Sequence, residues 1–169
     1  MKKIIAMTLC ATMALSLAAC AKKEEAPKAP EKEPTSQTAQ LANPFRDFDT
    51  LKEAEEAVGF SLEVPAAIPN WVSETAFRAM NNEMLEVIYN GKDDQFRIRK
   101  AAGSDDISGI QTAYSETEEV PVGERTVTCK GENGLVYVAV WQDGDYTYAM
   151  YFDNGMEQAS VIAMVETIR

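Results

Sequence analysis

Two arginines in the segment Gln95–Lys100 are the first residues whose spacing suggests binding chemistry. Phe96 and Ile98 alternate with Arg97 and Arg99, so in a strand both guanidinium groups project from the same face. Guanidinium groups bind carboxylates and phosphates through paired hydrogen bonds. In an acidic protein they also pair with neighbouring Asp and Glu side chains, which is the commoner arrangement. The segment therefore offers either an anion site or internal salt bridges.

Composition excludes most catalytic chemistry. The chain contains no histidine and only three cysteines, so Ser-His-Asp catalysis, Cys-His catalysis, histidine metal sites and cysteine-rich zinc sites are excluded. The acidic pairs Asp93-Asp94 and Asp105-Asp106 lack the spacing of a calcium loop, and no Gly-rich phosphate loop occurs. The sequence predicts no metal, no cofactor and no enzyme activity. A hydrolase that uses two carboxylates is an alternative, although pairs of acidic residues arise by chance in so acidic a chain.

The first 44 residues indicate export and a membrane anchor. Lys2 and Lys3 precede an apolar run that is too short to span a membrane and ends at Leu17-Ala18-Ala19-Cys20, the form of a cleaved signal peptide. This end resembles the lipobox of bacterial lipoproteins, which implies a signal peptide over 1–19 and diacylation of Cys20. An ordinary secretory signal is the alternative. Residues 20–44, rich in Lys, Glu and Pro, are expected to form a disordered tether. The protein would then sit on the extracytoplasmic face of the cell membrane, where two acyl chains anchor stably.

The remaining residues, 45–169, are expected to fold as a single domain. They hold 10 basic and 23 acidic residues, a net charge of −13. A domain of this charge repels polyanions, so nucleic acid and anionic lipid surfaces are not expected partners. Cationic partners, or neutral ones such as glycans, fit the charge better. Solvation of a surface protein is the simpler explanation.

The hydrophobic periodicity of this region predicts an α+β domain. Thr50 and Glu53 form a capping-box pattern for a helix that ends before Gly59, and residues 60–69 are expected to be extended. Seven strands are predicted, at 75–80, 84–89, 95–100, 112–117, 125–130, 135–141 and 146–152. A C-terminal helix over 157–168 carries an apolar stripe. The predicted fold is an antiparallel meander of about six to seven strands, with a short N-terminal helix and a C-terminal helix packed on one face.

Turn signals in the last three strands sort their side chains into two faces. A turn at Asp143-Gly144 would pair Trp141 with Tyr146, Ala139 with Tyr148 and Tyr137 with Met150, and a turn at Asn133-Gly134 would set Lys130 opposite Tyr137. One predicted face is aliphatic, belongs against the helix and holds Val127, Cys129, Val136, Val138, Val140, Ala149 and Tyr151. The other holds Trp141, Tyr146, Tyr148 and Tyr137. A one-residue slip at Asn133-Gly134 would reverse the assignments in 125–130.

The second face is the candidate recognition surface, because tyrosine and tryptophan are common anchors at interfaces. The alternative is that another layer, such as the first helix or residues 60–69, covers it. Cys129, on the aliphatic face, is expected to be a buried apolar side chain with little reactivity.

Three stretches carry a resemblance to a known family. Ala57–Phe60, the prolines before Trp71 and Ile98–Gly109 resemble a family of uncharacterised lipoproteins, mostly from clostridial-type Gram-positive bacteria. A similar domain of unknown function occurs as the extracellular part of some anti-sigma-type membrane proteins. The resemblance covers most of 50–169 and implies no activity or site residues.

The leading hypothesis is a non-enzymatic, membrane-anchored domain that binds a protein, peptide or glycan through its aromatic face. One alternative is a carrier that holds an apolar, lipid-like ligand between sheet and helices, which a sheltered cavity would favour. The carboxylate hydrolase is the other.

Overall fold

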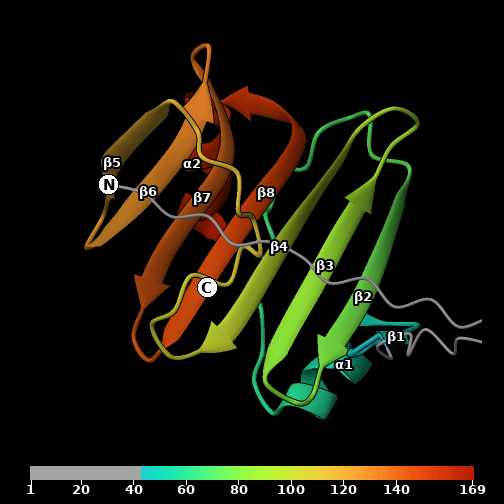
Figure 1. Cartoon of the computed structure of the whole chain (residues 1–169). Helices are drawn as coiled ribbons and strands as arrows, with labels where there is room; N and C mark the ends of the chain where they lie inside the picture. Colours follow the sequence, from blue (N-terminus) through green and yellow to red (C-terminus); the bar gives the residue numbers. More distant parts are fainter. Residues whose placement is uncertain (1–42) are drawn as a thin grey trace, which may run out of the picture. The chain divides into compact units, whose positions relative to one another are not determined.

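The computed structural model describes residues 43–169 (Figure 1). The predicted signal peptide, Cys20 and the tether as far as residue 42 lie outside the described residues. The elements, in chain order, are β1 (Phe45–Phe48), α1 (Leu51–Val58), β2 (Glu74–Met80), β3 (Met84–Asn90), β4 (Gln95–Ala102), β5 (Glu116–Val122), β6 (Arg125–Glu132), β7 (Leu135–Asp143), β8 (Tyr146–Glu157) and α2 (Gln158–Thr167).

The described strands form one antiparallel sheet in the order β1-β2-β3-β4-β8-β7-β6-β5. The predicted α+β class is confirmed, with eight strands in place of six or seven, because the short edge strand β1 carries no strong sequence signal. The predicted strand over 112–117 is wrong: residues 103–115 form a loop, and the strand begins at Glu116. We call residues 103–115 the crossover loop, since they connect β4 in the middle of the sheet to β5 at its edge.

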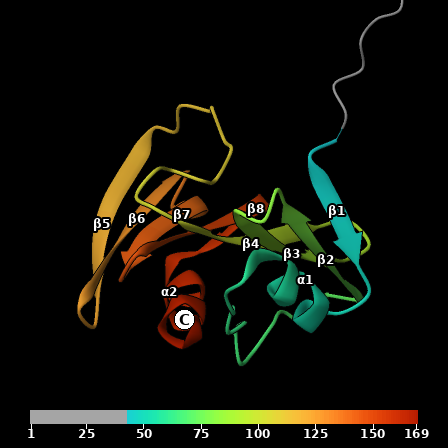
Figure 2. The same cartoon turned by 90° about the horizontal axis from the view of Figure 1, so that it is seen from below.

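Both helices lie on the same face of the sheet (Figure 2). The predicted capping box begins α1, with Thr50 Oγ1 accepting from the Glu53 amide and Glu53 accepting from the Thr50 amide. The helix ends at Gly59, whose φ of 83° is the left-handed conformation that favours glycine. Helix α2 follows β8 directly and buries Val161, Met164 and Val165. The core therefore lies between the helices and the sheet.

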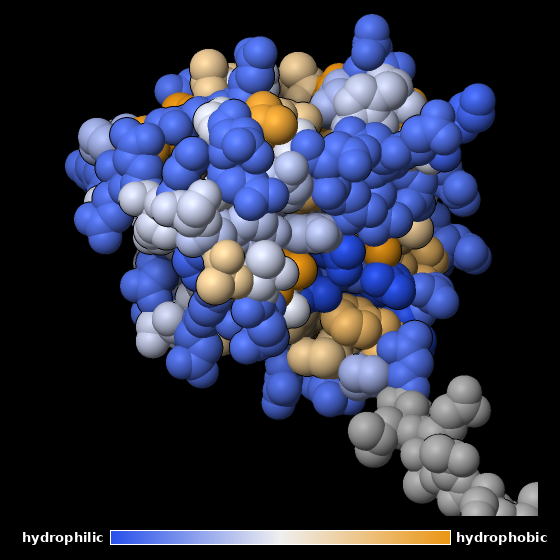
Figure 3. Space-filling view, turned by 45° about the horizontal axis from the view of Figure 1, so that its top comes forward, coloured by the Kyte–Doolittle hydropathy of each residue, from blue (hydrophilic) through white to orange (hydrophobic). Residues whose placement is uncertain are grey.

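Side chains of the two sheet faces have different roles. The helix-side face supplies most of the buried core, including Leu85, Val87, Phe96, Ile98, Met150 and Phe152. On the opposite face the crossover loop runs over the strands (Figures 1 and 2). Seen from the side of this loop, the surface is mostly hydrophilic (Figure 3).

A β-bulge reverses part of the predicted face assignment. The register of β6 against β7 shifts between Lys130 and Gly131, so Lys130 pairs with Val138 instead of Tyr137. Val127 and Cys129 consequently share the helix-side face with Trp141. Val127 and Cys129 lie on the helix side, as predicted, but Val138 and Val140 do not share that face with them. The extra residue of a bulge reverses the facing of one strand relative to its partner, so the predicted aliphatic face does not exist as one surface.

The last hairpin also differs in register from the prediction. Trp141 pairs with Tyr148 and Asp143 with Tyr146, whereas the turn signal predicted a pairing of Trp141 with Tyr146. The hairpin turns at residues 144–145, so the true register differs from the predicted one by two residues. A two-residue offset leaves each side chain on its predicted side of the strand, which is why Trp141, Tyr146 and Tyr148 still share one face.

Candidate binding sites on the two faces of the sheet

The aromatic face is covered. Trp141 and Tyr148 are 2% and 3% exposed, and their rings stack with centroids 5.3 Å apart inside the core. The prediction that they form an exposed recognition surface is wrong. The alternative prediction, that another layer covers this face, matches the structure: the helices pack on it. Burial of these aromatic rings beside valine and methionine side chains stabilises the fold.

Tyr146 and Tyr148 surround an internal cation. Lys100 Nζ lies 4.6 Å and 4.9 Å from their ring centroids and 5.8 Å from that of Phe60. The same amine donates to the carbonyl oxygen of Ser61 at 2.7 Å. Burial lowers the pKa of Lys100, while the charges of nearby acidic residues oppose the shift. These contacts fasten the segment after α1 to the sheet, so the tyrosine faces are occupied within the chain.

The prediction that Tyr137 shares a face with Trp141 is wrong: Tyr137 is half-buried on the opposite face, because the register of β7 against β8 shifts between Val136 and Val138. Its ring stacks on Tyr114 of the crossover loop, with centroids 5.3 Å apart. This candidate residue therefore holds the loop and is separated from Trp141 and Tyr148 by the sheet.

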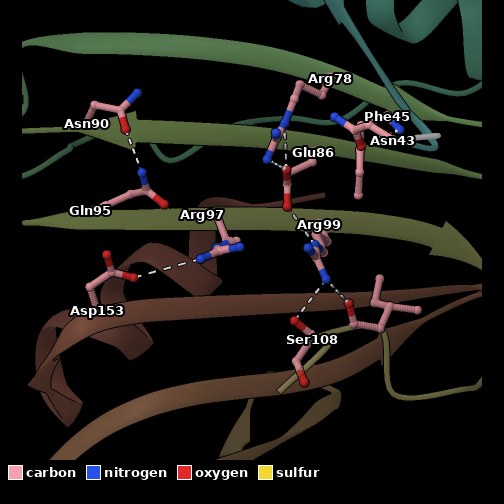
Figure 4. A network of polar contacts seen from close by, with 11 residues as sticks. Asn43, Phe45, Arg78, Glu86, Asn90, Gln95, Arg97, Arg99, Ser108 and Asp153 are labelled. Atoms are coloured by element: carbon pink, nitrogen blue, oxygen red, sulfur yellow. Dashed lines mark hydrogen bonds and ion pairs between the residues drawn. The ribbon is translucent and has the colours of Figure 1, made fainter. Parts of the chain in front are cut away.

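Glu86 is the centre of a buried polar network on the loop side (Figure 4). Its carboxylate has no exposed surface and accepts from Arg78 Nε at 3.0 Å and from Arg99 Nε at 2.7 Å. Arg99 Nη1 also donates to the carbonyls of Ile107 and Ser108, at 3.0 Å and 2.9 Å. The ring of Phe45 lies against both guanidinium groups, 4.9 Å from Arg78 and 5.6 Å from Arg99. Arg99 thus pairs with an acidic side chain, as in the commoner of its two predicted arrangements.

Arg97 lies on the same face of β4 as Arg99. Its guanidinium packs over the ring of Tyr151 at 4.8 Å and approaches the Asp153 carboxylate at 3.8 Å. Figure 4 shows Arg97 pointing toward Asp153 and Arg99 toward Ser108. Because the two side chains point toward different partners, they do not form one anion site.

Asp106 of the crossover loop has a structural role. Asp106 accepts from the Ser108 amide at 2.9 Å and from Lys130 Nζ at 2.8 Å. Partial burial alone would raise the pKa of Asp106, but the hydrogen bonds from Lys130 and Ser108 outweigh it and the pKa is lowered. Within residues 43–169 no group of three or more potential ligand side chains is placed to hold a metal ion.

Cys129 is buried, as predicted, with 3% of its surface exposed. Burial, with a smaller contribution from the charge of Glu118, raises the pKa of its thiol to about 11. A thiol protonated at neutral pH is a poor nucleophile.

An apolar groove of about 450 Å³ lies between the segment Ala66–Pro69 and α2. Its lining comprises Ala66, Ala67, Ile68, Pro69, Met156, Glu157, Ser160, Ala163, Met164 and Thr167. Ile68, 44% exposed, is the only large apolar side chain of the described region that is exposed. The Thr167 hydroxyl accepts from the Ala66 amide at 3.3 Å and donates to the Met164 carbonyl at 2.9 Å. This pair of bonds holds the two walls together.

The groove was missed in the sequence. Two signals could have indicated it: a proline-bracketed run of small apolar residues, Pro65–Pro69, and a C-terminal helix in which Glu166 is the single charged residue. No helix among residues 43–169 is long and apolar enough to cross a membrane.

Comparison with known proteins adds a family match. A family model described as a domain of unknown function, DUF4367, matches residues 65–168. The matched range contains both walls of the groove and the crossover loop, and it leaves out β1 and α1. No curated protein and no solved structure matches the chain significantly.

Proposed function

The chain belongs to the DUF4367 family of domains of unknown function, and from its own surface we propose that it is a non-enzymatic binding domain. Its ligand would be an apolar segment of a partner protein, received in the groove between Ala66–Pro69 and α2. The observation that supports this most directly is a mainly apolar groove, with Glu157 as its one ionisable lining residue, on a domain with a net charge of −13. Exposed apolar patches rimmed by polar residues mark interaction sites.

The openness of the groove favours a protein segment over a free lipid. Ala66, Ala67, Ile68 and Ala163 line the groove and are themselves exposed. A lipid chain lying there would keep one side exposed to water. The rest of a partner protein would shield the outer side of a bound protein segment from water. The lipid-carrier alternative would need a more enclosed cavity.

Charge complementarity defines the flanks of the partner segment. Glu157 is the only ionisable residue of the lining, and Glu166 is the only charged residue of α2. An apolar segment with basic flanks therefore suits the site, and one with acidic flanks is disfavoured. The groove is small, so we expect binding in the micromolar range or weaker, as for other small transient interfaces.

The cellular location is also a proposal and rests on the N-terminal sequence. The lipobox-like end at Cys20 and the resemblance to lipoproteins of clostridial-type Gram-positive bacteria support a lipid-anchored protein on the extracytoplasmic face of the membrane. Metabolic labelling with a clickable palmitate analogue tests this. Label should appear on the wild-type chain in its native host and be lost in Cys20→Ser, with the protein then released from the membrane fraction. Equal labelling of both would refute lipidation at Cys20.

The groove itself is tested with a coumarin-labelled peptide that has an apolar centre and lysine flanks. Fluorescence anisotropy should show saturable binding to the wild type and a loss of about tenfold or more in Ala163→Trp, which fills the groove. Ala159→Trp is the matched control, because Ala159 is also exposed on α2 but lies outside the lining. The same peptide with glutamate flanks should bind more weakly. If Ala163→Trp binds like the control, the groove is not the site.

A further inference from the structure

A second cavity, of about 480 Å³, lies where the β2–β3 turn, the end of β4, the residues after α1 and the crossover loop meet. We call it the end pocket, and its lining includes Phe60, Met80, Met84, Ile107, Glu83 and Asp105. It is separate from the groove, with which it shares no lining residue. Its volume is in the range of small-molecule sites, which combine an apolar lining with a few polar groups.

Two walls of the end pocket are fixed by contacts outside it. Phe60 is held by the ring of Tyr146 at 5.1 Å and by the ammonium group of Lys100. Ile107 is held by its carbonyl oxygen, which accepts from Arg99 Nη1. A pocket whose walls are already in place loses little ordering entropy when a ligand binds.

The third wall consists of two methionines at the end of one hairpin. Met80 and Met84 are direct partners across β2 and β3. Their unbranched, polarisable side chains adapt to different apolar shapes. The pocket therefore combines a rigid aromatic and aliphatic side with an adaptable one, which suits a small apolar body.

The ionisable side chains that line the end pocket are acidic, and neither has a basic partner among residues 43–169. Glu83 and Asp105 take part in no ion pair with any residue of 43–169. The basic residues of the adjoining strands are already engaged, Arg78 and Arg99 by Glu86 and Lys100 by Ser61 and its aromatic neighbours. A ligand's positive charge near these carboxylates would be attracted, and a negative charge would be repelled.

We propose that the end pocket binds a small organic cation, an amine or quaternary ammonium group attached to an apolar body. The apolar body lies against Phe60, Ile107 and the two methionines, and the cationic group lies beside Glu83 and Asp105. This inference does not depend on the groove or on its protein partner.

Isothermal titration of the full chain with octylammonium, octanol and octanoate tests the proposal, because the three probes share one apolar chain and differ in charge. We expect octylammonium to bind about tenfold tighter than octanol, and octanoate to bind weakest. The double variant Glu83→Gln/Asp105→Asn should bind octylammonium and octanol equally, with the affinity for octanol unchanged. Ala102→Trp, at an exposed position of the lining, should weaken both probes.

Matched controls separate the pocket from the overall acidity of the domain. Glu74→Gln/Asp93→Asn removes the same amount of charge from exposed positions outside the pocket and should leave the preference for octylammonium intact. Ala163→Trp, which blocks the groove, should leave all three probes unaffected. The proposal is overturned if octanoate binds as well as octylammonium, if both double variants reduce the preference equally, or if Ala102→Trp has no effect.

Discussion

Arg99 joins the buried carboxylate of Glu86 to the crossover loop through a single guanidinium group. Its Nε donates to Glu86 Oε2 at 2.7 Å, while its Nη1 donates to the carbonyls of Ile107 and Ser108. Arg78 completes the charge pairing from the other side of Glu86. One fully buried carboxylate therefore positions a loop that covers the sheet and forms one wall of the end pocket.

Replacing Glu86 by glutamine is expected to destabilise the fold strongly. The substitution keeps the shape but leaves two guanidinium groups without their counter-charge, and breaking a buried pair in this way costs about 3–5 kcal/mol. Urea unfolding followed by circular dichroism measures the change. Glu74→Gln, at an exposed position of β2, is the control and should stay within about 0.5 kcal/mol of the wild type. Equal midpoints for the two variants would show that the network adds no stability.

The contact between Gly109 and Arg99 allows a second test. A Cβ atom at Gly109 would lie 2.6 Å from Arg99 Nη1, whereas one at Gly123 would meet nothing within 4 Å. The two glycines have similar left-handed φ angles, 71° and 63°, so alanine at either position costs about 1–2 kcal/mol of backbone strain. Gly109→Ala should cost more than Gly123→Ala, because Arg99 must also give up hydrogen bonds worth about 1–3 kcal/mol. Urea unfolding measures both, and equal losses would contradict the role of the Arg99 contact.

Local signals explain which elements could be predicted from the sequence. The capping box at Thr50, the terminating Gly59 and the apolar stripe of the last helix act within a few residues, and both helices were found where expected. The burial of Cys129 against the helical layer was also predicted, although it shares that face with Trp141 instead of Val138 and Val140. The sequence indicated that Arg99 could pair with an acidic side chain, but it could not identify Glu86 as the partner, because Glu86 lies 13 residues away on a neighbouring strand.

The wrong face assignments and the unpredicted groove have a common cause: they depend on contacts between distant segments, which sequence periodicity does not reveal. The bulge at Gly131 put Val127 and Cys129 on the same face as Trp141, although a glycine inside a strand is itself a signal for a bulge. The covering of Trp141 and the formation of the groove both depend on how α2 and Ala66–Pro69 pack in three dimensions. Local patterns such as the proline-bracketed run Pro65–Pro69 indicate apolar segments, but they do not specify how these segments pack.

Gly131 is expected to tolerate no side chain. A Cβ atom there would overlap the carbonyl oxygen of Leu135 on the paired strand, so Gly131→Ala must break the local pairing or remove the bulge. Removal would shift β6 by one residue and turn Val127 and Cys129 away from the core. We expect a loss of about 3 kcal/mol or more in urea unfolding. Gly134→Ala in the adjoining turn, where no atom lies within 4 Å, is the control and should cost less.

Cys129 should resist alkylation in the native protein. Its thiol is buried and its pKa is raised to about 11, so at pH 8 the reactive thiolate is scarce and inaccessible. Treatment with iodoacetamide followed by peptide mass spectrometry should show Cys129 unmodified in buffer and modified in denaturing guanidinium chloride. Rapid modification in buffer would mean that β6 does not hold Cys129 in the core.

Stability should fall at alkaline pH because several buried groups resist ionisation. Burial raises the pKa of Tyr89 and of Tyr148 from 10.0 to about 12, and that of Cys129 from 9.0 to about 11. The native state therefore keeps protons that the unfolded chain releases, so the stabilisation is complete below pH 9 and is lost as the pH rises toward 12. Each such group contributes a slope of up to about 1.4 kcal/mol per pH unit between its two pKa values. Urea unfolding between pH 8 and pH 11.5 measures the loss in the free energy of unfolding. Tyr148→Phe should make this loss less steep by the contribution of one tyrosine. A decline of unchanged steepness in Tyr148→Phe would assign the effect to the growing negative charge of the domain instead.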